Sequence, residues 1–486
     1  MSLNFDWDSG RRQGIMKCES LDQIREHFSV KNDAAKFARR FGRTFIPARK
    51  YAITPAGRFD AGLYKQIIDF VAEHNVDDNI NYTDTFISNV KPGYKKTKPT
   101  QLKLKLRDYQ EDIVNRCLKV GRGTVILATA GGKTLTMSSL VESIYKQYDK
   151  NNFHGVIIVP DRGLVEQTYN DLKDYGVTFT FSKWTGDDEL DLTTNIVICN
   201  LGILQSSKSN TGWIHNVDLC IIDEVHKVRQ GNKINKIINK IHTPHRYGFT
   251  GTMPEELLDQ WNIIGKIGPV LYEKNSASLR EENYIAQVKA QILDLKYETQ
   301  PKYVLYPSEP LTPTKRYKRE IDFIINSDFR NNIIGKLSNK FDKNSLILID
   351  YIEHGEILLE YVKRHCKDKK VYFIRGEVAV EDRDKVKQLM EVSDDVVVIA
   401  ISKIFSTGIN IKNLHYIVFA GGGKAKIKTI QSIGRGLRLH KSKQQLIIID
   451  IGDDLMYGRQ HLQKRIEHYN KEKINYGRKT IKEESA

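Results

Sequence analysis

The residues best suited to chemistry begin with a lysine and a threonine that follow a small-residue turn. In TVILATAGGKT, an apolar run leads into the turn, and Lys133 and Thr134 then open a helical stretch. This context predicts a phosphate-binding loop, because backbone N–H groups and a helix N-terminus attract phosphate oxygens. Lys133 is expected to reach the β- and γ-phosphates and Thr134 to ligate Mg²⁺. The turn residues expected at the phosphates are Thr129, Ala130, Gly131 and Gly132.

The strict glycine-rich pattern fails at one position, since Leu127 stands where its first glycine belongs. The alternative is a tight strand-to-helix turn whose lysine is merely solvated. A second motif favours the chemical interpretation, because LCIIDEVH ends an apolar run with Asp223 and Glu224. Asp223 is expected to hold Mg²⁺, and Glu224 to orient and deprotonate the attacking water. The two motifs in this order predict a site that hydrolyses a nucleoside triphosphate.

Two series of apolar runs, separated by helical stretches, must position these motifs. The first series is TVILAT, GVIIVP, NIVICN, LCIIDE and RYGFTGT, and the second is SLILID, KVYFIRG, DVVVIAI, YIVFAG and QLIIIDI. Such alternation predicts parallel sheets with helices on both faces. We therefore predict two doubly wound α/β domains in tandem, at residues 106–275 and 276–460, with a less regular segment at 276–330.

The two ends of the chain have other patterns. Residues 1–90 predict a small α/β unit, because LDQIREHF and GLYKQIIDFVAEH have helical periodicity and RTFIPARKYAIT alternates like strands. KPGYKKTKPTQLKLK, at 91–105, contains no acid and predicts an exposed basic linker. Residues 461–486 are predicted to form a basic C-terminal helix with a loose tail.

Composition indicates an anionic partner. The net charge is +16, and basic residues gather between Lys31 and Lys50, where Arg39, Arg40 and Arg43 are expected to contact phosphates. No apolar run approaches the ~18 residues of a membrane span. The five cysteines are dispersed without metal-ligand spacing, which indicates reduced thiols. We expect a soluble cytoplasmic protein without a membrane partner or a structural zinc.

The ordered motifs resemble those of the superfamily-two DExH helicases. LRDYQ is similar to the family's adenine-recognition segment, which implies Arg107 and Gln110 near the base; ATAGGKT resembles motif I, and DEVH resembles motif II, with His226 at the nucleotide. VPDRGLVEQ resembles motif Ia, RYGFTGT motif III, FSTGIN motif V and QSIGRGLR motif VI. The resemblance implies two RecA-like domains that use ATP and Mg²⁺.

The same resemblance implies roles in both domains. Arg435 and Arg438 would reach across to the γ-phosphate as arginine fingers, because a guanidinium fork suits the charge of a transferring phosphoryl group. Gly408 and Gln431 would lie at the nucleotide. The residues implied to contact the nucleic-acid backbone are Arg162, Gly163, Thr252 and Thr407.

Within this superfamily, the chain is similar to the UvsW-like branch-migration DNA helicases of tailed phages. The similarity rests on KCESLDQIREHFSV with GRFDAGLYKQIIDFVAEHN, on LIDYIEHGEILLEYV with VYFIRGEV, and on IAISKIFSTGINIKNLHYIVFAGG with IKTIQSIGRGLR. It implies that residues 1–90 bind DNA and that the substrate is branched or forked DNA, such as a Holliday junction, in recombination, repair and recombination-dependent replication. A phage-encoded protein of this kind would act in the host cytoplasm. No protein partner is implied.

Three other functions stay open at this point. An RNA helicase would share the motifs that track a nucleic-acid backbone. The motor subunit of a restriction enzyme or other DNA-processing complex is a second alternative, although no nuclease-like cluster of carboxylates and lysine extends the chain. A clamp that binds ATP and DNA without turnover is the third, but such a clamp would not need the water-activating Glu224.

Overall fold

The structure, a computed structural model, describes residues 2–35, 46–76, 79–90, 98–149, 152–206, 209–229, 231–241, 243, 245–298, 312–375, 380–402, 411, 413–421 and 445–483. The chain divides into two compact units, one of Met1–Ala128 with Gly132–Lys274 and one of Thr129–Gly131 with Asn275–Ala486. Within the part described, no helix is long and apolar enough to cross a membrane. The finer domain limits at residues 90, 105 and 460 stay predictions.

The first unit begins with a small α/β layer around a four-stranded sheet in the order β5-β2-β1-β6. The antiparallel pair β1–β2 aligns Asp8 with Gln13, so a four-residue connection joins the two strands. Both predicted helices are confirmed, but of the alternating stretch before residue 55 only β4 is a strand in the part described. The elements are β1 (Ser2–Asp8), β2 (Gln13–Lys17), α1 (Leu21–His27), β3 (Ser29–Lys31), β4 (Arg49–Tyr51), β5 (Arg58–Phe59), η1 (Ala61–Leu63), α3 (Tyr64–His74), β6 (Asn79–Tyr82) and α4 (Asp84–Val90).

A seven-stranded parallel sheet follows in the same unit, in the order β13-β7-β12-β11-β8-β10-β9. Strands β8 and β10 are buried along their whole length, as expected where helices cover both faces. The five predicted strands are confirmed, and β9 and β13 are additional. The strands are β7 (Arg122–Leu127), β8 (Gly155–Val159), β9 (Phe181–Trp184), β10 (Ile196–Asn200), β11 (Leu219–Asp223), β12 (His245–Thr250) and β13 (Val270–Lys274). The helices are α5 (Asp108–Val120), α6 (Lys133–Tyr145), α7 (Arg162–Tyr175), α8 (Leu201–Gln205), η2 (Gly212–Asn216), η3 (Val225–Lys227), α9 (Lys233–Ile238) and α10 (Leu257–Ile267).

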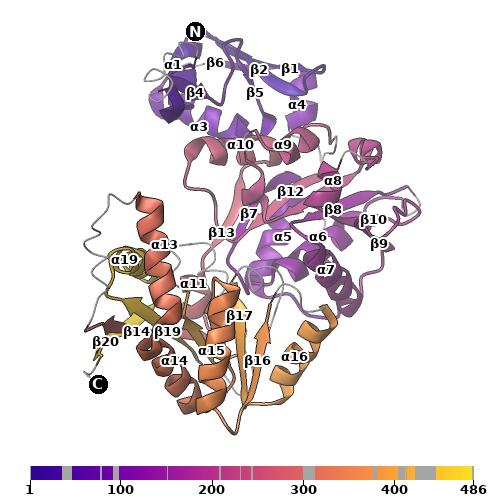
Figure 1. The fold of residues 1–486 in the computed structure, drawn as a ribbon. Coiled ribbons are helices and arrows are strands. Elements are labelled where there is room, and N and C mark those ends of the chain that lie inside the picture. Colours follow the sequence, from indigo (N-terminus) through magenta and orange to yellow (C-terminus); the bar gives the residue numbers. More distant parts are fainter. Residues whose placement is uncertain are drawn as a thin grey trace. The chain divides into compact units, whose positions relative to one another are not determined.

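Helix α10 belongs to the cores of both layers of this unit. Leu258, Trp261 and Ile264 pack into the apolar cluster of the N-terminal layer, whereas Ile263 and Ile267 belong to the cluster beneath the seven-stranded sheet. Figure 1 shows α10 between α3 and β12. Because residues three or four apart share a helix face, the two sets occupy different faces of α10. The N-terminal layer is therefore packed onto this helix through a continuous apolar core.

The second unit contains another seven-stranded parallel sheet, in the order β16-β17-β15-β18-β19-β14-β20. Its five predicted strands are confirmed, and with them the prediction of two tandem RecA-like α/β domains. The strands are β14 (Gln287–Lys296), β15 (Ser345–Ile349), β16 (Lys370–Ile374), β17 (Val396–Ile401), β18 (Tyr416–Phe419), β19 (Gln445–Asp453) and β20 (Asn475–Lys482). The helices are α11 (Ser276–Glu281), α13 (Pro313–Asn326), α14 (Asp328–Lys340), α15 (Ile352–His365), α16 (Val380–Val392) and α19 (Met456–Lys471).

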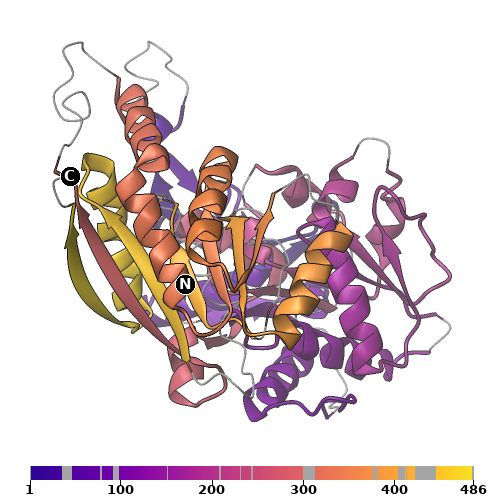
Figure 2. The same cartoon turned by 60° about the horizontal axis from the view of Figure 1, so that its bottom comes forward.

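Two predictions about this unit are wrong. The segment predicted to be irregular contains β14, which pairs with β19 over nine residues. At the chain end, α19 confirms the predicted helix, but the predicted loose tail contains the strand β20, which pairs in parallel with β14 (Figures 1 and 2). Its sequence NYGRKTIK hides this because an edge strand often carries charged side chains, which weaken the apolar signal.

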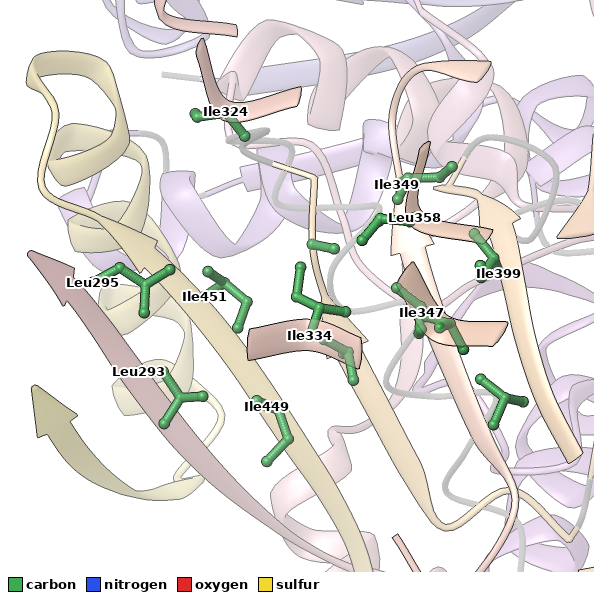
Figure 3. Packing of buried hydrophobic residues seen from close by; sticks show 14 of the residues in the cluster. Leu293, Leu295, Ile324, Ile334, Ile347, Ile349, Leu358, Ile399, Ile449 and Ile451 are labelled. Atoms are coloured by element: carbon green, nitrogen blue, oxygen red, sulfur yellow. The ribbon is translucent and has the colours of Figure 1, made fainter. Parts of the chain in front are cut away.

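The core of the second unit lies between its sheet and helices α14 and α15. Leu293, Leu295, Ile334, Ile347 and Leu358 belong to this cluster (Figure 3). A buried ion pair borders it, in which the guanidinium Nε of Arg330 lies 2.8 Å from Asp453 Oδ1. Arg330 also donates to the carbonyl of Ala420 at 2.7 Å, which ties α14 to the ends of β18 and β19.

Candidate active site

Three neighbouring strands of the first sheet place the predicted site residues at the carboxyl ends of the strands. Strand β12 lies between β7 and β11, and all three run parallel. The loop with Lys133 follows β7, Thr250 ends β12, and Asp223 ends β11. Since ligands of open α/β sheets bind at the carboxyl ends of their strands, this edge is the expected place for a nucleotide.

The loop before α6 turns through two left-handed residues. Ala130 has φ +65°, and Gly132 has φ +80° and caps the helix. A Cβ atom on Gly132 would lie 2.3 Å from the side-chain nitrogen of Gln110, and the left-handed φ also disfavours other residues there. The loop therefore keeps a tight turn at the end of β7, although Leu127 replaces the first glycine of the strict pattern.

Gln110 is buried against this loop. Its Oε1 accepts a hydrogen bond from the backbone N–H of Arg107 at 2.9 Å, and its Nε2 donates to the carbonyl of Gly132 at 3.5 Å. The Arg107 guanidinium contacts the hydroxyl of Tyr109 at 3.0 Å. The structure thus places Gln110 next to the phosphate loop, with Arg107 bonded to Gln110 through its backbone N–H; the contact of either residue with a base stays a prediction.

Lys133 and Glu224 bring the two predicted motifs together. Lys133 Nζ lies 3.6 Å from Glu224 Oε1, and the two side chains are only 12% and 19% exposed. Glu224 has φ +51°, a left-handed conformation that costs a non-glycine residue roughly 1–2 kcal/mol. Removing two charges from water costs free energy. A largely buried ion pair that includes a residue with strained backbone therefore indicates a functional role rather than a contribution to stability.

A hydrogen-bonded chain continues from Glu224 to the end of β12. His226 Nδ1 lies 3.2 Å from Glu224 Oε2 and 2.9 Å from Thr250 Oγ1. The Thr250 hydroxyl donates to the carbonyl of Thr252 at 2.9 Å, so it can only accept from His226. This assigns the proton of the imidazole to Nδ1, which faces both Glu224 and Thr250. The chain links the carboxylate of Glu224 to the segment that resembles motif III.

The electrostatics differ sharply between the two neighbouring carboxylates. Burial raises the pKa of Asp223 to about 6, and the negative charge of Glu224 adds to the rise. Burial also acts to raise the pKa of Glu224, but Lys133 and His226 together outweigh it and lower that pKa to about 2. Glu224 is therefore an anion at neutral pH, with its charge compensated by Lys133.

The residues at this edge suit a magnesium ion that arrives with a nucleotide. Asp223 and Thr134 supply a carboxylate and a hydroxyl, the hard oxygen donors that Mg²⁺ prefers. In the part of the chain that the structure describes, no group of three or more His, Cys, Asp or Glu residues is arranged to hold a metal. Because Mg²⁺ takes most of its ligands from phosphates and water, one or two protein oxygens suffice.

The predicted nucleic-acid contacts are only partly visible. Arg162 and Gly163 open α7, and Arg162 Nη1 pairs with Asp187 Oδ2 at 2.7 Å on the surface. Thr252 follows β12, where its carbonyl accepts from Thr250. The predicted site residues that lie outside the described residues are Arg39, Arg40, Arg43, Thr407, Gly408, Gln431, Arg435 and Arg438.

The sequence places Thr250 in the segment that resembles motif III, but it does not predict the contact that Thr250 makes with His226. Thr250 is fully buried, and it contacts His226 although 24 residues separate them in sequence. The signal was present, since Thr250 ends an apolar run as Asp223 does, and neighbouring parallel strands end at the same edge. Sequence alone does not state that β11 and β12 are neighbours.

Two protein families match the chain in tandem. The family described as "Type III restriction enzyme, res subunit" matches residues 103–255, and "Helicase conserved C-terminal domain" matches residues 326–440. The first match covers the phosphate loop, the paired carboxylates and Thr250. The second spans most of the second sheet and the segment that resembles motifs V and VI.

Individual relatives agree with these families. The chain is similar to "ATP-dependent DNA helicase uvsW" of Enterobacteria phage T4, with 28% identity over 96% of each chain. It is also similar to "DNA 3'-5' translocase XPB2" of Sulfurisphaera tokodaii, with 26% identity over 71% of this chain and 81% of that one. Among solved structures, the "ATP-dependent Type ISP restriction-modification enzyme LlaBIII bound to DNA" matches 85% of this chain and 34% of its own, at 14% identity and TM-score 0.56. That likeness shows the fold alone.

Proposed function

We propose that this chain, which carries both domains of a superfamily-two helicase, uses ATP to unwind or branch-migrate branched DNA. Its family matches and relatives make it an ATP-dependent DNA helicase; the proposal concerns its residues, its substrate and its role. The observation that carries the catalytic part is the convergence of Lys133, Glu224 and Thr250 at one edge of the first sheet.

The phosphate loop and the paired carboxylates would divide the work of hydrolysis. Lys133 would leave Glu224 for the β- and γ-phosphates, since it is held by an ion pair that a nucleotide can replace. Glu224 would then orient and deprotonate the attacking water. Asp223 and Thr134 would hold Mg²⁺, which neutralises phosphate charge when it is bound with ATP.

The second domain would complete the site with Arg435 and Arg438 as arginine fingers. This assignment rests on QSIGRGLR, within the segment that the C-terminal helicase family matches. Supplying a guanidinium from another domain would make hydrolysis depend on closure of the two domains. Gly408 and Gln431 would line the nucleotide on the same side.

DNA would be gripped through its phosphates rather than its bases. Arg162, Gly163, Thr252 and Thr407 are the proposed backbone contacts in the two motor domains. Arg162 is now paired with Asp187 on the surface, so a phosphate would replace that carboxylate. Binding that depends on phosphates has little sequence preference and weakens steeply with salt.

Branched DNA is the proposed substrate, in recombination, repair and recombination-dependent replication. Support comes from the similarity to the phage T4 uvsW helicase, which extends over 96% of both chains and so includes the N-terminal layer. Arg39, Arg40 and Arg43, in the sequence of residues 1–90, are proposed phosphate contacts. A layer packed onto α10 can hold one DNA arm in fixed relation to the first motor domain.

The test is ATP turnover measured in parallel with single-stranded, duplex, forked and four-way DNA and with RNA, followed by migration of a labelled four-way junction. We expect the greatest stimulation by forked and four-way DNA, and junction migration that requires ATP hydrolysis. Stimulation by RNA alone would replace this proposal with that of an RNA helicase. ATP binding without turnover on any substrate would favour a clamp.

A further inference from the structure

We propose that a basic cavity between the N-terminal layer and the seven-stranded sheet of the first unit binds the phosphate backbone of a DNA arm. The cavity measures about 560 Å³. The inference rests on the proposed DNA substrate and adds a second place where that DNA is held. Five cationic side chains and one carboxylate line the cavity: Arg11, Arg12, Arg122, Arg246, Lys266 and Asp60.

The cavity is distinct from the nucleotide site. Arg122 is the first residue of β7, and Arg246 is its partner on β12. Strand β7 ends at Leu127, five residues further on, which at ~3.3 Å per residue is about 17 Å along the strand. The cavity therefore lies at the amino edge of the sheet, and an anion bound there is not the phosphate that Lys133 holds.

The two walls of the cavity are fixed to each other. Lys266 Nζ, at the end of α10, lies 2.7 Å from Asp60 Oδ2 in the N-terminal layer, and Gln13 donates to the other oxygen at 2.9 Å. A Cβ atom on Gly62 would lie 1.8 Å from the carbonyl oxygen of Ile264, so the two backbones touch. The only carboxylate of the lining is thus already engaged, and the walls cannot separate without breaking this contact.

The motor-domain wall supplies positive charge from two half-buried arginines, Arg122 and Arg246. Arg122 and Arg246 both donate to the carbonyl of Lys266, where α10 ends. This carbonyl carries only a partial negative charge, so the two guanidinium groups keep a net positive charge. Arg246 Nε is buried, and no residue in the described part of the chain accepts its hydrogen bond.

The opposite wall presents two exposed arginines from the connection between β1 and β2. Asp8, the acid at its start, pairs with Arg58 at 2.9 Å and accepts from the backbone N–H of Arg11 at 3.0 Å. Arg12 has φ +57°, which turns the chain back toward β2. Within the described ranges, neither Arg11 nor Arg12 side chain has an ion pair, so both guanidiniums are available to a ligand.

This chemistry fits a phosphodiester better than a base. Guanidinium forks match phosphate oxygens, and an excess of positive charge attracts a polyanion without regard to sequence. Ser88 and Asn89 add neutral hydrogen-bonding groups to the lining, and Trp7 adds an aromatic edge. The volume lies in the range of pockets that enclose a small ligand, which is room for a phosphate with its sugar.

The test compares two double variants of the full-length protein. Arg11→Gln/Arg12→Gln removes two charges from the cavity, and Lys17→Gln/Lys65→Gln removes two from exposed positions of the same layer outside it. Binding of a fluorescent four-way DNA is measured without nucleotide over a salt series. For the arginine variant we expect about tenfold weaker binding at ~100 mM salt and a salt slope smaller by about 1–2. The lysine variant should lose much less, and DNA-free ATP turnover should match wild type in both.

Other outcomes separate the two proposals. Equal losses in both variants would overturn the cavity site while leaving the proposed function intact. Absence of DNA binding by the wild-type protein would overturn the proposed function itself. A titration with inorganic phosphate gives the remaining comparison. Suppose that the wild-type protein binds phosphate saturably, that the arginine variant does not, and that both bind DNA with the same affinity. The cavity would then be a small-anion site, and the DNA assignment would be overturned.

Discussion

The ammonium group of Lys133 lies 3.6 Å from the carboxylate of Glu224, so the two motifs at the strand ends of the first sheet meet directly. The same carboxylate contacts His226, which joins it to Thr250 at the end of the next strand. A nucleotide that binds Lys133, as proposed, would therefore break a contact of Glu224, the proposed base. We expect this change to be passed through His226 to the segment after β12.

Replacing Lys133 by alanine should lower ATP turnover by at least ~100-fold, because the γ-phosphate would lose its proposed positive partner. DNA binding without nucleotide should stay close to wild type. Lys119→Ala, at an exposed position on α5, is the control and should leave turnover unchanged. Wild-type turnover by the Lys133 variant would remove the loop from the active site.

The hydroxyl of Thr250 is expected to couple the nucleotide site to DNA. Thr250→Val keeps the volume of the side chain but removes the acceptor for His226. ATP binding should persist, while stimulation of turnover by DNA should fall roughly tenfold, which corresponds to the ~1.4 kcal/mol upper range of one hydrogen bond. Thr180→Val removes a hydroxyl that bonds Asn195 instead, and should leave the stimulation intact. Equal stimulation in both variants would contradict the coupling.

Because the N-terminal layer packs on α10, the role of this layer in DNA binding cannot be tested simply by deleting it. Deleting residues 1–90 would expose Leu258, Trp261 and Ile264, so loss of activity would report misfolding as well as lost DNA contacts. A point variant is sharper, because the Trp261 ring lies 5.5 Å from that of Phe28 across the interface.

Trp261→Ala should therefore lower the free energy of unfolding by about 3–5 kcal/mol, the usual loss for a buried tryptophan. Leu257→Ala, on the exposed side of the same helix, should cost much less. Chemical denaturation followed by circular dichroism measures both. A Trp261 variant as stable as the Leu257 variant would show that the layer is not part of the core of the unit.

A buried histidine should make the stability of the second unit depend on pH. Burial lowers the pKa of His354 to about 3, and the charge of Arg330 adds to this. Because the folded pKa lies below the unfolded value of about 6.5, the unfolded chain binds the proton first and stability falls as the pH drops below that value. The loss reaches about 2 kcal/mol at pH 5. In His354→Gln, the midpoint of chemical denaturation should change less between pH 7 and pH 5 than it does in the wild-type protein. An equal change in both proteins would show that His354 is not the group responsible.

The sequence predicts those parts of the fold in which burial on both faces leaves a continuous apolar run. All ten predicted core strands are present for this reason, from β7 to β19. β14 and β20 escaped prediction because their residues alternate or carry charge, and because β20 pairs, among the described strands, with β14, which is far away in the sequence. Strand pairing across such distances follows from tertiary packing, which no local pattern contains.

The active site shows the same division. Lys133, Asp223 and Glu224 were predictable because each follows an apolar run and each has a chemical role that its type implies. The chain from His226 to Thr250 depends on which strands are neighbours, and the contact of Gln110 with Gly132 depends on how helix α5 packs against the loop before α6. The arginines of the basic cavity were not predictable as a group, because they come from separate stretches near residues 11, 122 and 246.

The central claim is that the carboxylate of Glu224 activates water at a site whose ATP turnover is stimulated by DNA. ATP turnover by Glu224→Gln tests this claim most directly. The variant keeps the size and hydrogen-bonding capacity of the side chain but cannot accept the proton of water. We predict that it binds ATP and four-way DNA like wild type, whereas DNA-stimulated turnover falls by roughly 10²–10⁴-fold. Turnover at the wild-type rate would contradict the account.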